Sequence, residues 1–493
     1  MESISLLWFK RDLRLEDHAV LKSMEQSKWP VLIFYIFEPS LIQNHNYDAR
    51  HWRFVWQSLV DLKSNLNQKG HFLNVYYGEM MDFLKYLNAK FKIQTLNSHE
   101  ETGLKITFDR DKTVKDFCKN QQIVWHEFQQ FGVIRKITRQ QRNNWSELWV
   151  KQMQEPLSFT DFQNFKSFPL ELNLFHEKRI PADFKTYNKN FQPGGETMAW
   201  KYLKSFFNKR YIGYSKFISK PFEARETCSR VSPYLAWGNV SIKQVYHGLH
   251  TVIHDSNHKR DLLNFQSRLF WHCHFIQKFE SDCRIEFENF NRAFDAVRNE
   301  ENDIYISTWE NGQTGYPLVD ACIRCVKETG YLNFRMRAMI VSFLTHNLFQ
   351  HWKFGVEFLA RQFLDFEPGI HYPQFQMQAF TQGTNTMRIY NPVKQSQDHD
   401  PKGFFIRKWC PELNDIPAEL IHEPWKLNDW EQTMYNCQIG IDYPYPIVDH
   451  EISARFAKEK LSEIVKSEEA KLGIQKILKK HHRLKENEED EGS

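Results

Sequence analysis

The spacing of hydrophobic and polar residues differs between two parts of this chain of 493 residues. In the first 130 residues, short runs rich in β-branched and aromatic residues alternate with segments whose apolar side chains recur every three or four positions. The expected strands are 4–9, 31–37, 72–78, 93–98 and 123–128, and the expected helices are 48–69, 81–91 and 110–120. This alternation predicts a doubly wound parallel sheet of the α/β class, which binds ligands beyond the carboxyl ends of its strands.

Beyond residue 130 the periodicity of apolar residues changes. The polar segment 131–196, which contains Pro and Asn, is typical of an interdomain linker. From there the chain is almost wholly helical, with helices expected at 198–207, 241–254, 261–279, 318–329, 334–352 and 356–363. We therefore expect an α/β domain at 1–130, a linker at 131–196, an all-α domain at 197–450 and a C-terminal helix and tail at 451–493. The tail ends in ENEEDEGS, a composition typical of disorder.

Composition narrows the class of protein only slightly. The 41 Phe, 19 Tyr and 15 Trp allow a large core, and a net charge of +4 neither supports nor excludes a nucleic-acid partner. The eight Cys are scattered without a disulfide framework and no signal peptide precedes the first strand, so we expect a cytoplasmic monomer with reduced thiols. Since no run of 18 apolar residues is present, no membrane association is expected.

Two arginines at the start of an apolar helical run indicate a pocket. Arg335 and Arg337 are followed, after a second expected helix, by Asp365, Glu367 and His371. A buried charge without a partner costs several kcal/mol, so these side chains must pair with one another or meet a ligand. No glycine-rich G-x-G-x-x-G segment occurs, which disfavours an ordinary dinucleotide site.

The turn after the first strand carries the first of several motifs that match one family. Charges this dense between apolar runs usually form a solvated turn, but WFKRDLRLEDHAVL (8–21) closely resembles the opening of the cryptochrome/photolyase flavoproteins. Further matches follow in family order over nearly all of residues 1–450. They are TCSRVSPYLAWGNVS (227–241), WENGQTGYPLVDACIR (309–324), the R-x-R of 335–337, the D-x-E of 365–367, RIYNP (388–392) and DPKGFFIRKWCPEL (400–413).

The resemblance implies FAD as cofactor. A turn with hydroxyls and free backbone amides suits the flavin diphosphate, and the arginine and acid cluster would line the flavin, with Arg337 paired to Asp365. His371 stands where many relatives place an Asn beside the flavin ring; a core histidine bonded to a carbonyl is an equal alternative. The implied cofactor-binding residues are Tyr214, Cys228, Ser229, Arg230, Val231, Ser232, Trp271, Arg335, Arg337, Asp365, Glu367 and His371.

The activity that the resemblance implies is light-driven repair of a cyclobutane pyrimidine dimer flipped out of ultraviolet-damaged DNA, by electron transfer from reduced FAD. Trp271 matches a tryptophan that stacks on the lesion, whereas Arg268 replaces a common glutamate. The expected catalytic residues are Trp271, Arg268, His371 and Trp352, and no metal is expected. The altered cavity leaves a preference for single strands open. The main alternative is a cryptochrome-type photoreceptor without repair activity.

Other family substrates and cofactors fit less well. The (6-4) photoproduct is disfavoured because LNFRMR (332–337) lacks the histidines of those enzymes, and an iron-sulfur cluster because the one C-x-x-C, Cys322 and Cys325, lies within a helix. A flavin oxidoreductase that works in the dark is a third, weaker option.

The electron relay of the family is only partly matched. Trp352 corresponds to its middle tryptophan and Phe375 replaces the first, while no Trp lies near Asn299. We therefore expect another aromatic route, for which the sequence offers Tyr305, Tyr316, Tyr372, Tyr390 and Trp409.

Two further sites are implied. The expected DNA-binding residues are Trp271, Arg335, Met377, Lys394, Arg407 and Lys408. For any single charge other than Arg407, a solvated side chain is the favoured alternative. The segment NSHEETG (97–103) resembles the place where a folate or deazaflavin antenna docks, with Glu100 or Glu101 as a ligand.

Overall fold

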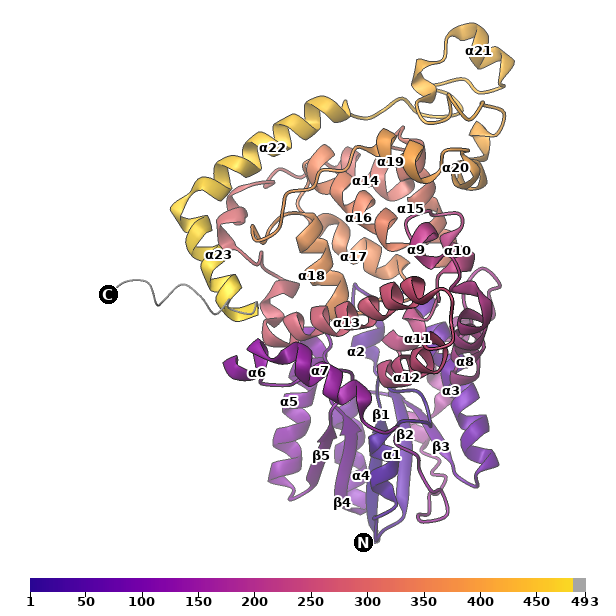
Figure 1. Ribbon diagram of the computed structural model, residues 1–493. Coiled ribbons are helices and arrows are strands. Elements are labelled where there is room, and N and C mark those ends of the chain that lie inside the picture. The colour runs from indigo at the N-terminus through magenta and orange to yellow at the C-terminus, as the bar shows by residue number, and fades with distance from the viewer. Residues whose placement is uncertain (482–493) are drawn as a thin grey trace.

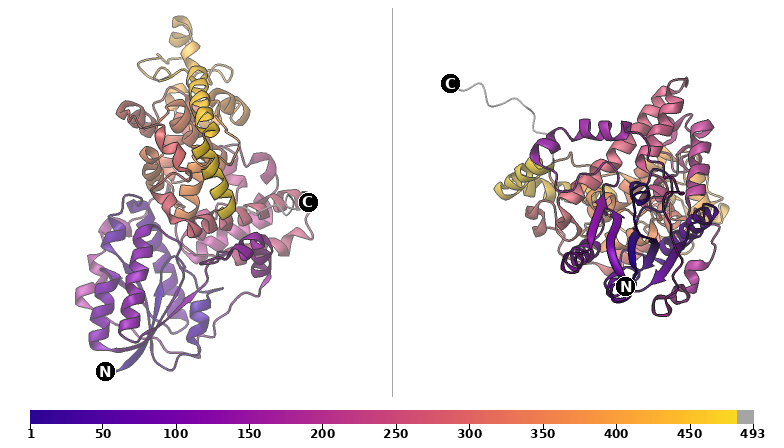
Figure 2. Two further views of the ribbon diagram at one scale, coloured as in Figure 1. Left: turned by 90° about the vertical axis from the view of Figure 1, so that its left-hand side faces the viewer. Right: turned by 90° about the horizontal axis from the view of Figure 1, so that it is seen from below.

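The computed structural model of the protein describes residues 1–481. An α/β domain forms one end of the molecule and a larger helical domain the other (Figures 1 and 2). Five parallel strands build one sheet in the order β3-β2-β1-β4-β5. Their bounds are β1 (Ser3–Phe9), β2 (Val31–Phe37), β3 (Leu73–Tyr77), β4 (Lys92–His99) and β5 (Val124–Phe128). The predicted doubly wound parallel sheet is therefore confirmed.

Both faces of this sheet are covered by helices. Leu6 and Trp8 of β1 point into a core shared with α4 (Met80–Lys90) and α5 (Lys105–Asn120). Leu7 and Phe9 point the opposite way, toward α1 (Ala19–Met24) and α3 (Ala49–Gln68). Because successive side chains alternate between faces, a strand covered on both sides must be apolar throughout. All seven residues of β2 are buried.

The segment predicted to be a linker contains more structure than its sequence suggests. It holds α6 (Arg139–Asn143) and α7 (Trp145–Gln154), then three short turns, and it meets the sheet at single bridges from Val31 to Ser167 and from Tyr76 to His176. Trp145 and Trp149 of α7 are buried, and α7 packs on α12 (Ile242–Ile253). The segment thus joins the two domains by packing against both.

The helical domain is organised around two long-range helix contacts. Helix α13 (Lys259–Ser281) lies along α18 (Pro368–Gln378), and α15 (Pro317–Thr329) lies against α20 (Phe404–Trp409). The single helix predicted for 334–352 is wrong. Helix α16 (Phe334–Ser342) runs into a π-helical turn at Phe343–Asn347, Phe349 has a φ of +52°, and α17 (Lys353–Gln362) follows separately. Likewise, the predicted C-terminal helix is two, α22 (His450–Lys466) and α23 (Glu468–His481).

The remaining helices are α2 (Pro39–Ile42), α8 (Glu196–Ser205), α9 (Tyr214–Phe217), α10 (Ala224–Thr227), α11 (Ser232–Ala236), α14 (Asp303–Asn311), α19 (Pro392–His399) and α21 (Asp429–Met434). Among residues 1–481, no helix combines the length and the hydropathy needed to cross a bilayer. The predicted disordered tail lies outside the described residues.

Candidate functional site

An ion pair between α16 and the loop before α18 forms the centre of the candidate site. Arg337 Nη2 lies 2.8 Å from Asp365 Oδ2, so the predicted pairing of these residues is confirmed. Arg337 also donates to the Leu332 carbonyl at 2.7 Å and stacks 4.0 Å above the Phe363 ring, which fixes its guanidinium. Burial alone would raise the pKa of Asp365, but Arg337 and the Ser232 hydroxyl lower it below its usual value. The carboxylate is therefore ionised.

The second oxygen of Asp365 has no protein partner. Oδ1 is buried and accepts no hydrogen bond from any described residue. Buried polar atoms in folded proteins are nearly always bonded, so this oxygen indicates a missing donor. A ligand with an N–H or O–H group at this position would satisfy it, and the imide N–H or a hydroxyl of FAD is such a group.

Glu367 pairs with the other domain. Its Oε2 lies 3.2 Å from Arg11, which follows β1 and also donates to the carbonyls of Ala236 and Phe366 at 2.9 and 2.8 Å. Burial raises the pKa of Glu367 to about 7, and the charge of Arg11 opposes this shift only in part. The carboxylate of Glu367 is thus used at the interface between the two domains. Its expected contact with the flavin stays a prediction.

Two histidines flank Asp365. On α18, His371 Nε2 lies 2.8 Å from the Val356 carbonyl, so this nitrogen carries the proton and Nδ1 is left as an acceptor. Burial lowers the pKa of His371 to about 4. The carbonyl bond of the core alternative is thus present, while the role beside the flavin stays a prediction.

His272 on α13 is the residue that the sequence analysis missed. Burial lowers its pKa to about 4, the charge of Arg11 lowers it further and that of Asp365 opposes the shift. Its ring lies 5.5 Å from the ring of Phe131. Its position next to Trp271 was the one available signal.

The turn at 228–232 lies beside the same acid. Arg210 donates to the carbonyls of Cys228 and Ser229 and so holds the turn from behind. Arg230, with a φ of +60°, stacks 3.6 Å from the Tyr331 ring and donates to Gln192 at 2.7 Å. No carbonyl of the described turns and loops accepts from the amides of Ser229 to Ser232. Donors that face one way suit phosphate oxygens.

The remaining implied cofactor residues line this side of the domain. Tyr214 is buried against Phe206 and Phe265, with ring centroids 5.9 Å away from each, and burial raises its pKa. Val231 is buried and Ser232 reaches Asp365. The structure therefore brings Tyr214, the turn and the charge pair together, as a bound FAD would require.

The mouth of the site is aromatic. Trp271 of α13 is 46% exposed although it contacts Phe275 at 5.9 Å, and Phe334 at the start of α16 is 49% exposed. Arg268, one helical turn before Trp271, is exposed and donates to Asn264 at 3.1 Å. Met377 on α18 is half-buried. A half-exposed indole beside a buried ion pair is an available stacking surface.

The residues expected to bind DNA differ in how far their side chains are already bonded within the protein. Arg335 donates to the Tyr390 hydroxyl at 3.4 Å, and Lys394 forms an exposed pair with Asp398 at 3.4 Å. Arg407 donates to the carbonyls of Lys402, Asn414 and Ile416, so it holds its own loop in place. Lys408 lies 5.5 Å over the Trp409 ring. DNA contact by these residues stays a prediction, and for Arg407 a role in loop structure is the stronger one.

An aromatic chain leads away from His371. Tyr372 has its ring 5.8 Å from His371 and 6.2 Å from Trp352, and Trp352 is fully buried with its Nε1 bonded to Asn289 at 2.7 Å. Phe375 lies 5.6 Å from His371. Of the five rings that the sequence offered, Tyr372 alone has a recorded ring contact with Trp352 among the described residues.

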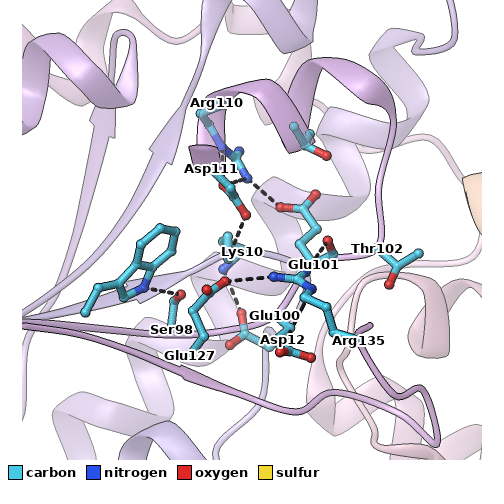
Figure 3. A network of polar contacts seen from close by, with 12 residues as sticks. Lys10, Asp12, Ser98, Glu100, Glu101, Thr102, Arg110, Asp111, Glu127 and Arg135 are labelled. Carbon is cyan, nitrogen blue, oxygen red and sulfur yellow. Dashed lines mark hydrogen bonds and ion pairs between the residues drawn. The ribbon is translucent and has the colours of Figure 1, made fainter. Parts of the chain in front are cut away.

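The segment expected to hold an antenna is part of an ion network at the carboxyl edge of the sheet (Figure 3). Arg110 pairs with Glu38, Glu101 and Asp111 at 2.7, 2.6 and 2.9 Å. Glu100 lies 3.9 Å from Arg135, whose guanidinium also pairs with Glu280 of α13 at 3.2 Å. The hollow beside Glu101, which is open on one side, measures about 30 Å³, which has room for water only. Neither glutamate is free to bind a pterin in this arrangement.

One buried cluster has the composition of a metal site. The ligand atoms of Asp12, His18 and His99 lie within 4.8 Å of one another. His18 Nδ1 accepts from the Leu21 amide, so its Nε2 carries a proton toward Asp12 Oδ2 at 3.1 Å, and His99 Nδ1 lies 2.7 Å from the same oxygen. Both nitrogens nearest to Asp12 Oδ2 carry a proton and so are not metal ligands, and we assign this cluster to polar packing around Asp12.

These features define a class of two-domain flavoproteins, in which a parallel α/β domain is joined to a helical domain with an FAD cavity. The family described as the FAD binding domain of DNA photolyase matches residues 265–463, and DNA photolyase matches residues 5–141. Together the two matches span more than half of the chain. The protein belongs to the cryptochrome/photolyase family.

Similar proteins include both branches of the family. The chain is 28% identical to the deoxyribodipyrimidine photo-lyase of Alkalihalophilus pseudofirmus, over 91% of this chain and 96% of the relative. It is 27% identical to the cryptochrome DASH of Gloeobacter violaceus, over 90% and 93%. The crystal structure of a Synechocystis sp. PCC6803 cryptochrome superimposes with a TM-score of 0.85 at 24% identity, over 93% of this chain and 99% of the other. These matches establish the fold, the FAD-binding domain and a photolyase-like protein.

Proposed function

We propose that the protein is a light-driven lyase that repairs cyclobutane pyrimidine dimers in ultraviolet-damaged DNA, with FAD as cofactor. The observation that carries this proposal is the exposure of Trp271. A large aromatic ring is left 46% exposed on α13, the helix that lies along α18, and the charge of Asp365 acts on His272, the residue after Trp271. A flipped pyrimidine pair stacked on that ring gains about 1–3 kcal/mol per base. The name of the relative from Alkalihalophilus pseudofirmus agrees with this chemistry.

FAD, when bound, supplies light-driven one-electron chemistry. Arg337 and Asp365 would hold it, and the unpaired Oδ1 of Asp365 would accept a hydrogen bond from it. His371 would present an unprotonated Nδ1, since its Nε2 donates to the Val356 carbonyl. A proton held on a flavin nitrogen would thus meet an acceptor here, where an Asn side chain could turn and donate instead.

Arg268 would act on the lesion side. It stands one helical turn from Trp271, is exposed, and bonds to Asn264 at 3.1 Å and to the Tyr214 hydroxyl. A guanidinium offers five donors and a fixed positive charge, which stabilise negative charge as it develops on a bound pyrimidine carbonyl. The charged guanidinium of Arg268 would thus take the place of the neutral donor that a protonated glutamate would provide.

Reducing electrons would reach the cavity through Tyr372 and Trp352. Their ring centroids are 6.2 Å apart and their planes are nearly perpendicular. The Tyr372 hydroxyl donates to Asn46 at 2.9 Å, and burial raises its pKa. An amide oxygen does not take the phenolic proton, so we propose that the tyrosine relays an electron only transiently and that Trp352 holds the oxidising equivalent longer.

For a second chromophore, the network around Arg110 leaves one place open. A cleft of about 270 Å³ between α2, α4 and α5 borders Glu38 and Arg110 from outside, which approaches the size of small-molecule pockets. An antenna of the folate or deazaflavin type would have to bind there, and not at Glu100 or Glu101 as the sequence suggested.

The test is repair in light. Purified reduced protein is illuminated with ultraviolet-damaged oligothymidine, single-stranded and annealed, while absorbance near the thymine band is followed. We expect recovery in light and none in the dark. Trp271→Ala should weaken dark binding of the damaged strand roughly fivefold or more, whereas Trp430→Ala, which removes a 70% exposed indole on α21, should not. No recovery in either form of DNA would contradict the proposal.

That negative outcome would favour a blue-light photoreceptor without repair activity. Two observations support this alternative. Arg268 stands where dimer-repairing relatives often have a glutamate, and similar proteins from Gloeobacter violaceus and Synechocystis sp. are named cryptochrome DASH. In a photoreceptor, light would still reduce the flavin through Tyr372 and Trp352, but damaged and undamaged strands would bind equally.

A further inference from the structure

A pair of exposed phenylalanines from distant parts of the chain lies beside the mouth of the site. Phe222, between α9 and α10, and Phe404, the first residue of α20, have ring centroids 5.7 Å apart. They are 41% and 51% exposed. Isolated exposed apolar side chains are common on protein surfaces, but two exposed rings in contact with each other offer a surface on which planar groups can stack.

Both rings are held by rigid loops. Gly403 has a φ of +66°, which a residue with a Cβ rarely adopts, and Asp400 accepts from the amides of Phe405 and Ile406 at 3.1 and 2.9 Å. Arg407 bonds the Lys402 carbonyl from the other side. The loop that leads to Phe222 is fixed where Asn333 donates to the Ile218 carbonyl at 3.0 Å. A platform fixed in advance loses little conformational entropy when a ligand binds.

The platform adjoins the start of α16. Asn333, which holds the Phe222 loop, is the N-cap of α16, and Phe334 follows it at the mouth. Lys220, two positions before Phe222, has its Nζ 5.9 Å from the Phe217 ring, and Arg335 follows Phe334 on α16. The loop that carries Lys220 and Phe222 is thus tied through Asn333 to the helix that carries Arg337.

The charge around the rings is positive. Lys402 lies 5.9 Å over the Phe404 ring, and neither Lys402 nor Lys220 forms an ion pair with a described acid. Glu223, Asp398 and Asp400 are acids nearby; Asp398 pairs with Lys394, and Asp400 is buried and accepts from backbone amides. Aromatic faces bordered by unpaired lysines fit a chain of stacked bases with phosphates along its edge. A duplex buries its base faces and cannot use such a surface.

We propose that Phe222 and Phe404 form a stacking platform for unpaired bases that flank the bound site, which makes single-stranded DNA the preferred partner. The inference deepens the proposed function by naming the form of DNA. The bases next to a lesion in the cavity would stack on the two rings, while Lys220 and Lys402 contact phosphates. The contact does not depend on sequence, because every base has a face to stack.

The experiment is a binding titration in the dark with the flavin-loaded protein and undamaged, fluorescently labelled oligothymidine or a duplex of the same length. Phe222→Ala, Phe404→Ala and the double variant should each bind the single strand about tenfold more weakly or worse, with duplex affinity changed less than twofold. Phe159→Ala, which removes an equally simple, 61% exposed phenylalanine from the linker, is the matched control and should bind as the original protein does. Lys220→Gln should reduce the slope of log affinity against log salt by about 0.7.

Equal affinity of the phenylalanine variants and the original protein for single strands would overturn the proposal. So would an equal loss for duplex, which would indicate a general DNA surface. Phe404→Leu keeps apolar bulk in case alanine disturbs the loop, and should lose the same affinity with an unchanged flavin spectrum. Because these titrations use undamaged DNA in the dark, they succeed or fail independently of light-dependent repair.

Discussion

Replacing Asp365 by Asn tests whether the buried ion pair holds the cofactor. The substitution keeps the size of the side chain but removes its charge, so Arg337 loses the carboxylate that lies 2.8 Å from its guanidinium. It also places an amide N–H₂ near the position of Oδ1, where the structure has a buried acceptor without a partner. A ligand that donates to Oδ1 would then face a donor or lose its bond.

The expected loss of FAD affinity follows from how deeply Asp365 and Arg337 are buried. Removing one partner of a fully buried charge pair costs about 3–5 kcal/mol. Asp365 is 6% exposed, but the side chain of Arg337 is 26% exposed and keeps some access to water. We therefore expect the lower part of the range for ligand binding, about 2–3 kcal/mol, which weakens FAD binding roughly 30- to 150-fold.

The assay is a titration of deflavinated protein with FAD, followed by quenching of flavin fluorescence, together with the melting temperature with and without FAD. Asp398→Asn is the control, because that carboxylate forms an exposed pair with Lys394 and should change FAD affinity less than twofold. If Asp365→Asn protein binds FAD within about threefold of the original while melting alike, the pair is structural and the assigned cavity is wrong.

Two further outcomes follow from the same structure. Tyr372→Phe keeps the ring that contacts Trp352 but makes it harder to oxidise. Flavin photoreduction with an external donor should therefore slow by tenfold or more in transient absorption. Tyr305→Phe should not change this rate, and equal rates in the two variants would refute the route. Burial lowers the pKa of His51 to about 4, so this residue is neutral when folded and takes up a proton below about pH 6.5 when unfolded. The free energy of unfolding should therefore fall by about 3 kcal/mol per such histidine between pH 6.5 and 4, and urea titrations of His51→Gln should show a flatter dependence than those of a variant at the exposed His45.

The predictions that succeeded depend on local pattern. Strands buried on both faces are apolar without interruption, and β1 and β2 were located within a residue of their observed bounds. The pairing of Arg337 with Asp365 was also predicted, since buried charges need partners. The prediction of a single helix at 334–352 was wrong because here the local pattern was misleading. Its apolar spacing continues through the π-helical turn at Phe343–Asn347, so the pattern could not reveal where the helix ends.

The buried histidines show a second limit. The charges of Asp365 and Arg11 act on the pKa of His272, yet in the sequence it is one polar residue in a helix with an ordinary apolar stripe. Its importance arises from α13 packing on α18, a contact between segments about 100 positions apart. Spacing along one helix identifies which face is buried, but it does not say which side chain of another helix that face will meet.

The charged turn after β1 shows the same limit most clearly. Dense charge between apolar runs favours a solvated turn, yet Lys10, Arg11, Asp12, Arg14 and Asp17 are all buried. Their partners come from elsewhere in the chain: Lys10 pairs with Asp111, Arg11 with Glu367 and Asp17 with Lys243. Through its pair with Glu367, Arg11 brings a positive charge of the α/β domain to the loop that also carries Asp365, and this charge lowers the pKa of His272. The electrostatics of the site therefore depend on how the two domains pack, so substitutions at Arg11 should alter the cavity even though it lies outside the FAD-binding region.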